Sequence, residues 1–262
     1  MKRNIIALSF LIILNAYITP DTEASLIGYW DFNKGIGDMA NDSSGFGNNA
    51  TGLSSGWVPG KYGYGTTSDN IVVPPDASLL TSSSLTISAW VKIDEFNGLQ
   101  RRILEMAPNY GFLFNPPNAS LETPFLLTLN LDQRSFEFQK PQLGEWFYAA
   151  VTWDGTTARF YYNGVAITPI AFEKTLVLDN SVSLFMGAPG YTLDEVRFYN
   201  EVLSPHEITR DMNFDSTIIP EPATLILLAG GLTGAFLRRE KRISSGDVGL
   251  APIKWTPRNQ WV

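Results

Sequence analysis

Paired carboxylates are the groups in this sequence best suited to acid–base chemistry. Asp94-Glu95 and Asp194-Glu195 are adjacent pairs, His206 is the only histidine, and cysteine is absent. A glycosidase needs two carboxylates that face one substrate, and in a strand only residues at alternate positions share a face. We therefore expect the members of each pair to point to opposite faces, and we predict no catalytic residues. The chain has neither a glycine-rich phosphate loop nor a His-Glu-x-x-His metal motif.

Aromatic side chains in turn-like segments offer a different chemistry, the binding of sugar rings. A flat ring stacks on the apolar face of a pyranose while nearby polar groups bond to its hydroxyls. Four aromatic residues lie in such segments, and we predict carbohydrate-binding roles for Trp57, Tyr62, Tyr64 and Tyr110. The alternative for each of them is a packing role at the rim of the domain. The tryptophans in strand-like segments are predicted to belong to the core: Trp30, Trp90 and Trp146.

The central part of the chain is acidic. Between residues 25 and 219 there are 11 Lys or Arg and 21 Asp or Glu, which gives a net charge of −10. Binding of nucleic acid requires a cationic surface, so we expect no nucleic acid partner. The absence of cysteine excludes disulfides and thiolate metal sites. Divalent cations and neutral glycans are compatible with this composition.

Short strands separated by turn signals must position these side chains. Residues 85–93 alternate large apolar with small or polar residues, a period typical of a strand with one buried face. Asp154-Gly155 and Asn163-Gly164 are typical of tight hairpin turns. Further strands are predicted at 26–32, 70–73, 146–153, 158–162, 182–186 and 193–199, with a hairpin from 125–131 to 135–138 across residues 132–134. The pattern indicates an antiparallel sandwich or barrel.

One short helix is expected near the end of this strand series. Ser204 is a capping residue, Pro205 suits the first helical turn, and Glu207 stands three residues after the serine. The segment 204–208 is therefore predicted to be helical.

An ordered series of motifs gives the central region a family resemblance. The motifs lie at 28–32 (GYWDF), 42–48 (DSSGFGN), 57–63 (WVPGKYG), 85–92 (LTISAWVK), 146–164, 193–200 (LDEVRFYN) and 203–208 (LSPHEI). Together they resemble laminin-G-like domains of the concanavalin A-like lectin/glucanase fold. The match is poor at 65–69, where the family commonly has an apolar strand that ends in Asp-Gly. The resemblance implies an all-β fold: a two-sheet antiparallel jelly-roll sandwich of concanavalin A-like type.

The resemblance also places the first and last strands side by side, which brings Asp194 toward the loop 42–49. This loop supplies Asp42 and Asn48, and Ca²⁺ binds six to eight oxygen atoms. We predict a structural calcium ion held by Asp42, Asn48 and Asp194. Alternatively, the two loop residues only form turns, and Asp194 pairs with Arg197 or caps the backbone. Glucanases of this fold carry alternate acidic residues on one strand, a motif that is absent here.

Both ends of the chain resemble targeting segments. Lys2 and Arg3 precede an apolar run of about 14 residues, and cleavage after Ala24 would release residues 1–24 as a signal peptide. A short membrane anchor is the alternative. Because the apolar run is too short to span a bilayer comfortably, the signal peptide is favoured.

The C-terminal end resembles the PEP-CTERM sorting signal of Gram-negative bacteria. Pro220, Glu221 and Pro222 precede an apolar run at 223–237, and Arg238 and Arg239 follow it. The resemblance implies a transmembrane helix and processing by an exosortase-type peptidase. A plain membrane anchor is the alternative. Because basic residues at the end of a membrane span resist translocation, we expect this basic cluster to stay on the cytoplasmic side.

These observations divide the chain and predict its role. The predicted parts are a signal peptide (1–24), a sandwich (25–210), a linker with the Pro-Glu-Pro motif (211–222), a transmembrane segment with a basic cluster (223–242) and a tail of unknown role (243–262). We predict an exported recognition module without catalytic activity that binds glycan or exopolysaccharide. A structural or protein-binding surface protein is the main alternative, and a divergent glycosidase is a weaker one.

Overall fold

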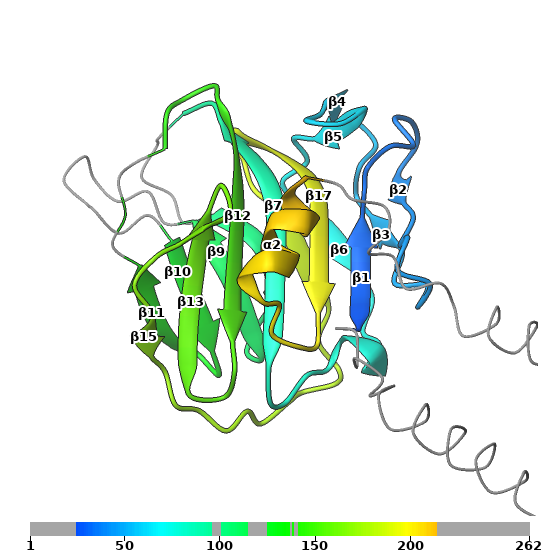
Figure 1. Ribbon diagram of the computed structural model, residues 1–262. Helices are drawn as coiled ribbons and strands as arrows, with labels where there is room; N and C mark the ends of the chain where they lie inside the picture. The colour runs from blue at the N-terminus through cyan, green and yellow to red at the C-terminus, as the bar shows by residue number, and fades with distance from the viewer. Residues whose placement is uncertain (1–24, 96–100, 115–124, 137, 139–140, 214–262) are drawn as a thin grey trace, which may run out of the picture. The chain divides into compact units, whose positions relative to one another are not determined.

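The computed structural model describes residues 25–95, 101–114, 125–136, 138 and 141–213 (Figure 1). The chain divides into two compact units, Met1–Ile219 and Pro220–Val262. The predicted signal peptide, Pro-Glu-Pro motif, basic cluster and tail lie outside the described residues. Within the described part of the chain, no helix is both long and apolar enough to cross a membrane.

Two antiparallel sheets form the domain, as predicted. Sheet A has nine strands in the order β14 (Val165–Ala166), β13 (Thr157–Tyr162), β12 (Trp146–Trp153), β7 (Leu85–Ile93), β17 (Tyr191–Tyr199), β5 (Tyr64–Thr66) and β4 (Trp57–Pro59), with β1 (Leu26–Trp30) beside β17 and β15 (Ile170–Ala171) beside β13. Sheet B has eight strands in the order β11 (Asp132–Phe136), β10 (Phe125–Leu129), β9 (Tyr110–Phe114), β8 (Arg101–Met106), β16 (Leu184–Gly187), β6 (Ile71–Val73), β3 (Ala50–Thr51) and β2 (Met39–Ala40). A short 3₁₀ turn, η1 (Ala77–Leu79), and helix α2 (Pro205–Met212) complete the described elements.

The main core lies between the two sheets and follows from strand alternation. In β7, Ile87, Ala89 and Val91 belong to this core, whereas Ser88 and Trp90 between them face the opposite side. Aromatic rings from both sheets fill the space. Phe125 of sheet B stacks on Phe160 of sheet A with ring centroids 4.4 Å apart. Each fully buried aromatic side chain contributes about 1.5–3 kcal/mol of apolar burial.

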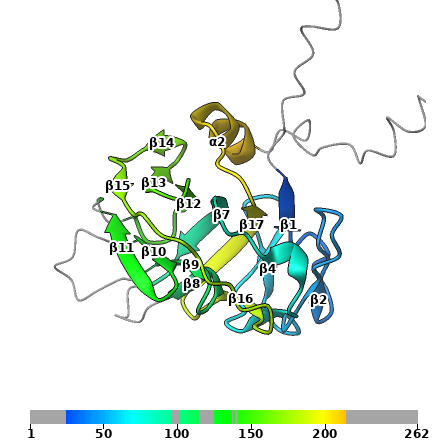
Figure 2. The same ribbon diagram turned by 90° about the horizontal axis from the view of Figure 1, so that it is seen from below.

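Helix α2 covers the outer face of sheet A, the face away from sheet B (Figure 2). Ser204 and Glu207 form a capping box, as the sequence predicts. Asp211 in the last turn is only 2% exposed, and its carboxylate accepts four hydrogen bonds from the sheet. The donors are Ser88 Oγ (2.6 Å), Tyr148 OH (2.5 Å), Tyr199 OH (2.9 Å) and Arg197 Nη1 (2.9 Å). This carboxylate therefore fixes the helix to the sheet.

Most of the predicted hairpin turns are found in the structure, and one lies at a different position. Strands β12 and β13 meet across residues 154–157, and Asn163 and Gly164 both have positive φ in the next turn. The predicted turn at 132–134 is wrong, because β11 already begins at Asp132. The reversal is made instead by Asn130 (φ 45°) and Leu131 (φ 68°). Leucine rarely adopts a positive φ, so the residue type at position 131 did not indicate a turn.

Candidate functional site

The β4–β5 hairpin brings three of the four predicted sugar-binding aromatics together. Trp57 begins β4, Tyr64 begins β5, and Tyr62 lies in the turn between these strands. The hairpin joins sheet A where Thr66 pairs with Leu193 of β17. These three residues therefore lie within one local unit at the edge of sheet A.

A surface patch, which we call the hairpin rim, consists of Ile36, Trp57 and Tyr64. The side chain of Tyr64 is 48% exposed and that of Ile36 is 72% exposed, while Trp57 is half-buried. The Tyr64 ring packs on Gly35, where an added Cβ would approach its Cδ2 to 2.8 Å. Trp57 Nε1 donates a 2.6 Å hydrogen bond to the carbonyl of Gly37. The loop 33–38 thus holds both aromatic rings in place.

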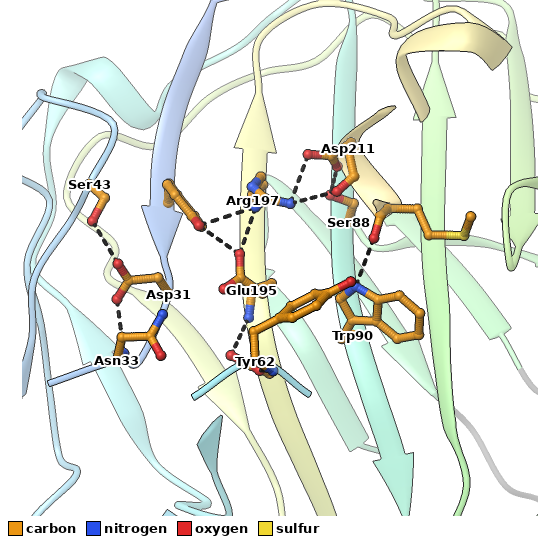
Figure 3. Close-up of polar contacts among 12 residues, drawn as sticks. Asp31, Asn33, Ser43, Tyr62, Ser88, Trp90, Glu195, Arg197 and Asp211 are labelled. Carbon is orange, nitrogen blue, oxygen red and sulfur yellow. Dashed lines mark hydrogen bonds and ion pairs between the residues drawn. The ribbon is translucent and has the colours of Figure 1, made fainter. Parts of the chain in front are cut away.

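Polar groups border the hairpin rim. The Asn33 side-chain oxygen accepts a hydrogen bond from the backbone N–H of Tyr64 at 3.2 Å. The Asn33 N–H donates to Asp31 Oδ1 at 3.0 Å, and Ser43 Oγ donates to Asp31 Oδ2 at 3.2 Å (Figure 3). A ring face with an amide group beside it can recognise a sugar by stacking and hydrogen bonding.

Tyr62 faces a different aromatic cluster, on the outer face of sheet A. Its ring packs edge-on against Trp90 with centroids 6.2 Å apart, and Lys61 Nζ lies 4.2 Å from the Trp90 centroid. Trp90 is only 8% exposed and donates from Nε1 to the carbonyl of Met212 at 3.2 Å. Burial raises the pKa of the Tyr62 hydroxyl. Tyr62 is therefore partly a packing residue, which is the alternative the sequence left open.

Asp194 on β17 holds the hairpin turn. Its Oδ2 accepts from the backbone N–H of Tyr62 at 2.9 Å, and its Oδ1 accepts from Glu195 N at 2.8 Å. The side chain is fully buried, and this burial raises its pKa to about 8. The turn of the hairpin thus rests on a carboxyl group for which the charged form is disfavoured.

Glu195 lies in a β-bulge, and here the prediction that Asp194 and Glu195 face opposite sides is wrong. The register of β17 with β7 shifts between Asp194 and Arg197, and Glu195 has φ 53°. Asp194 pairs with Trp90 and Arg197 with Ser88, both of which face outward. Glu195 Oε2 accepts from Tyr29 OH at 2.6 Å. It also accepts from Arg197 Nη2 at 2.6 Å (Figure 3). The extra residue therefore places both carboxyl groups on the outer side.

Two of the three predicted calcium ligands lie together. Asp42 accepts from the N–H groups of Tyr29 (2.9 Å), Ser44 (2.9 Å) and Asn48 (2.8 Å). Asn48 is buried and donates to the Ile27 carbonyl at 2.9 Å.

Asp194 instead bonds to the hairpin turn, so the structure gives these three residues separate hydrogen-bonding roles. Among the described residues, no three acidic, histidine or cysteine side chains are arranged to hold a metal. The carboxylate oxygens of Asp42 face N–H donors, which fits turn formation better than cation binding. The calcium site stays a prediction.

Tyr110 is wrongly predicted to bind sugar. Its side chain is fully buried, and its hydroxyl donates to the carbonyl of Leu79 at 2.5 Å. The turn-like segment around it suggested exposure, yet Tyr110 already begins β9 and points between the sheets. The predictions for the strand tryptophans fare better. Trp30 and Trp90 are buried, and Trp146 is half-buried.

Sequence reasoning missed Asn33 and Ile36, which flank the aromatic rings. The available signal was the repeated glycine at 35 and 37, since a Gly-x-Gly segment displays its central residue on a tight loop. Their proximity to Tyr64 depends on the packing of two loops separated by some 30 residues. A single sequence carries little information on such a contact.

Comparison with known families decides the relationship of this chain. Residues 65–209 match the family described as the concanavalin A-like lectin/glucanases superfamily. The chain belongs to this superfamily. Its laminin-G-like sandwich was predicted from the ordered motifs, and that prediction is confirmed.

The same comparison identifies the C-terminal signal. Residues 219–242 match the PEP-CTERM protein-sorting motif, which confirms the predicted sorting signal. Its key residues are Pro220, Glu221, Pro222, Arg238 and Arg239. The motif implies an exported protein that exosortase sorts to the cell surface. No curated protein sequence matches the chain significantly.

Solved structures share the fold at low sequence identity. Domain 4 of AbnA, a GH43 extracellular arabinanase from Geobacillus stearothermophilus solved with arabinotriose, is 21% identical with a TM-score of 0.59, and the match covers 72% of this chain and 99% of that domain. The binding domain of Paraclostridial Mosquitocidal Protein 1 is 16% identical with a TM-score of 0.57, covering 72% and 52%. The binding domain of botulinum neurotoxin DC, solved with SialylT, is 14% identical with a TM-score of 0.57, covering 72% and 51%.

Proposed function

We propose that this superfamily member is an exported, non-catalytic recognition module that binds carbohydrate or matrix polymer. The observation that carries the proposal is the hairpin rim. Tyr64 presents nearly half of its side chain to solvent beside Trp57 and Asn33. Because an exposed ring held by hydrogen-bonded loops loses little conformational freedom on binding, it is suited to stack on a sugar.

The comparisons support a glycan ligand. Domain 4 of AbnA was solved with arabinotriose, and the botulinum neurotoxin DC domain with SialylT. These ligands belong to those proteins, and their identity with this chain is 21% or less. Their value here is to show that sandwiches of this fold accommodate saccharides.

The sorting motif sets the place of action in this proposal. A PEP-CTERM signal would hold the protein in the inner membrane of a Gram-negative bacterium before exosortase processing. The processed protein would then act at the cell surface or in the extracellular matrix. The ligand that such a location offers is exopolysaccharide.

A polysaccharide pull-down and glycan array with the purified protein test the proposal. We expect Tyr64→Ala to weaken binding at least about fivefold, which corresponds to ~1 kcal/mol of lost ring stacking. Val177→Ala is the control, because Val177 is 78% exposed and lies beside the β10–β11 turn through Asn130. This control should bind like the wild type.

Two results would contradict the proposal. A folded wild-type protein that binds no glycan would move the assignment to a structural or protein-binding surface protein. Equal losses in Tyr64→Ala and Val177→Ala would show that the hairpin rim is not the binding surface.

A further inference from the structure

Arg101 occupies an unusual position for a charged residue. It begins β8 in sheet B, and its side chain is fully buried. The guanidinium carbon lies 5.9 Å from the ring centroid of Tyr191, a member of the main core at the start of β17. An arginine cation thus lies at the end of the space between the two sheets.

The polar side-chain atoms of Arg101 and Tyr191 lack hydrogen-bond partners. Within the described part of the chain, Nε, Nη1 and Nη2 of Arg101 and the hydroxyl of Tyr191 make no hydrogen bond. A guanidinium group carries five N–H donors, and a buried donor without an acceptor is strongly unfavourable. Burial accordingly lowers the pKa of Arg101. Buried donors on two neighbouring side chains without an acceptor are suited to binding the oxygen atoms of a ligand.

One carboxylate lies at the edge of this site. Glu95 Oε1 is 3.9 Å from Arg101 Nη2, too far for a hydrogen bond, and the Glu95 side chain is 60% exposed. The Glu95 and Asp94 N–H groups both donate to the carbonyl of Gly190, at 3.4 and 3.0 Å. The site is therefore bordered by an acidic side chain that lies largely in solvent.

Gly190 adds no side chain of its own beside the guanidinium. It has φ +81°, and an added Cβ would lie 2.5 Å from Arg101 Nη1 and 2.8 Å from Glu95 Cγ. Any other residue would be strained and would press on both side chains. The turn before β17 thus exposes only backbone to the arginine.

We propose that Arg101 and Tyr191 bind a carboxylate of an acidic saccharide, such as a uronic acid residue. A planar guanidinium matches a carboxylate through two parallel hydrogen bonds, and the tyrosine hydroxyl supplies a third donor. The ligand carboxylate takes the place beside Nη2 that Glu95 now borders. This inference rests on the proposed glycan-binding function and names the class of glycan.

Thermal shift and titration with oligogalacturonate test the site, with its methyl ester as the neutral counterpart. The full-length wild-type protein should bind the acid at least about tenfold more tightly than the ester, since charge-assisted hydrogen bonds are the stronger ones. Arg101→Met should remove this preference and leave binding of the ester unchanged. Its melting temperature should not fall, because an apolar chain replaces a buried charge that makes no hydrogen bond and whose nearest carboxylate is 3.9 Å away.

Three further variants sharpen the test. Arg102→Met is the matched control on the same strand, since Arg102 stacks on Phe185 instead, and it should keep the preference. Tyr191→Phe should reduce the preference severalfold. Glu95→Gln should strengthen binding of the acid, because it removes the competing negative charge.

Two results would overturn the inference. One is equal binding of acid and ester by the wild type. The other is a large fall in melting temperature for both Arg101→Met and Glu95→Gln with the preference intact, which would make the pair a structural ion pair. If binding of the ester persists and still depends on Tyr64, the proposed function survives this failure. If neither sugar binds, both proposals fail.

Discussion

Replacing Asp211 by asparagine should detach helix α2 from sheet A. The carboxylate accepts hydrogen bonds from Arg197, Tyr148, Tyr199 and Ser88, and it is 2% exposed. Breaking a buried ion pair by removing one partner costs about 3–5 kcal/mol, because the other charge is left uncompensated. Arg197 keeps a second partner in Glu195, so we expect the lower end, about 3 kcal/mol.

Urea denaturation monitored by fluorescence measures this loss. Trp90 provides a local signal, since its indole N–H bonds to the carbonyl of Met212 at the end of α2. We expect a lower midpoint for Asp211→Asn, and a change in tryptophan emission before global unfolding that is absent when Trp90 is replaced by Phe. Asp69→Asn, an exposed acid, is the control and should stay within about 0.5 kcal/mol of the wild type. A loss below about 1 kcal/mol in Asp211→Asn would refute the anchoring role.

Three other outcomes follow from single residues. Burial raises the pKa of Asp194 from 3.8 to about 8, so the folded protein binds a proton that the unfolded chain has released, and its stability should fall as pH rises through this window. Asp194→Asn should flatten this fall, and denaturation midpoints at pH 5 and pH 8.5 measure the slope. If Asp42 holds calcium, EDTA should lower the melting temperature of the wild type and not of Asp42→Asn, whereas no shift in either contradicts the site. Tyr110→Phe should cost about 1–3 kcal/mol in denaturation and leave glycan binding unchanged, since it strands the Leu79 carbonyl.

Regular parts of the fold could be predicted because each depends on neighbouring residues alone. The alternation in β7 predicts its bounds, Leu85–Ile93, as the structure has them. Asn163-Gly164 and the Ser204 capping box are likewise local signals with a fixed backbone geometry. The family resemblance then placed the first and last strands side by side, which local patterns do not contain, and β1 does pair with β17.

The remaining features depend on an irregular backbone or on distant contacts. The bulge at Glu195 inserts one residue opposite Ala89, and nothing in a run of apolar and charged residues marks its place. It decides whether Asp194 and Glu195 share a face. Strand β8 begins with Arg101 and Arg102, which a composition-based reading does not place in a sheet. Tyr110 was predicted to lie in a turn although it belongs to a strand. The nearby proline and glycine mark a turn, but that turn ends just before Tyr110, whose side chain points into the core.

Strand β17 links the two proposed binding sites through its first four residues. Tyr191 points into the main core, near Arg101. Asp194 points to the outer face of sheet A and accepts a hydrogen bond from the hairpin that carries Tyr64. An acidic polysaccharide that contacts both sites gains effective concentration for the second contact, and a short oligosaccharide does not. Tyr64→Ala and Arg101→Met should therefore each cost a long chain more affinity than they cost a short oligosaccharide, which reaches one site at a time. Equal losses at every chain length would show that the two sites bind separate ligands.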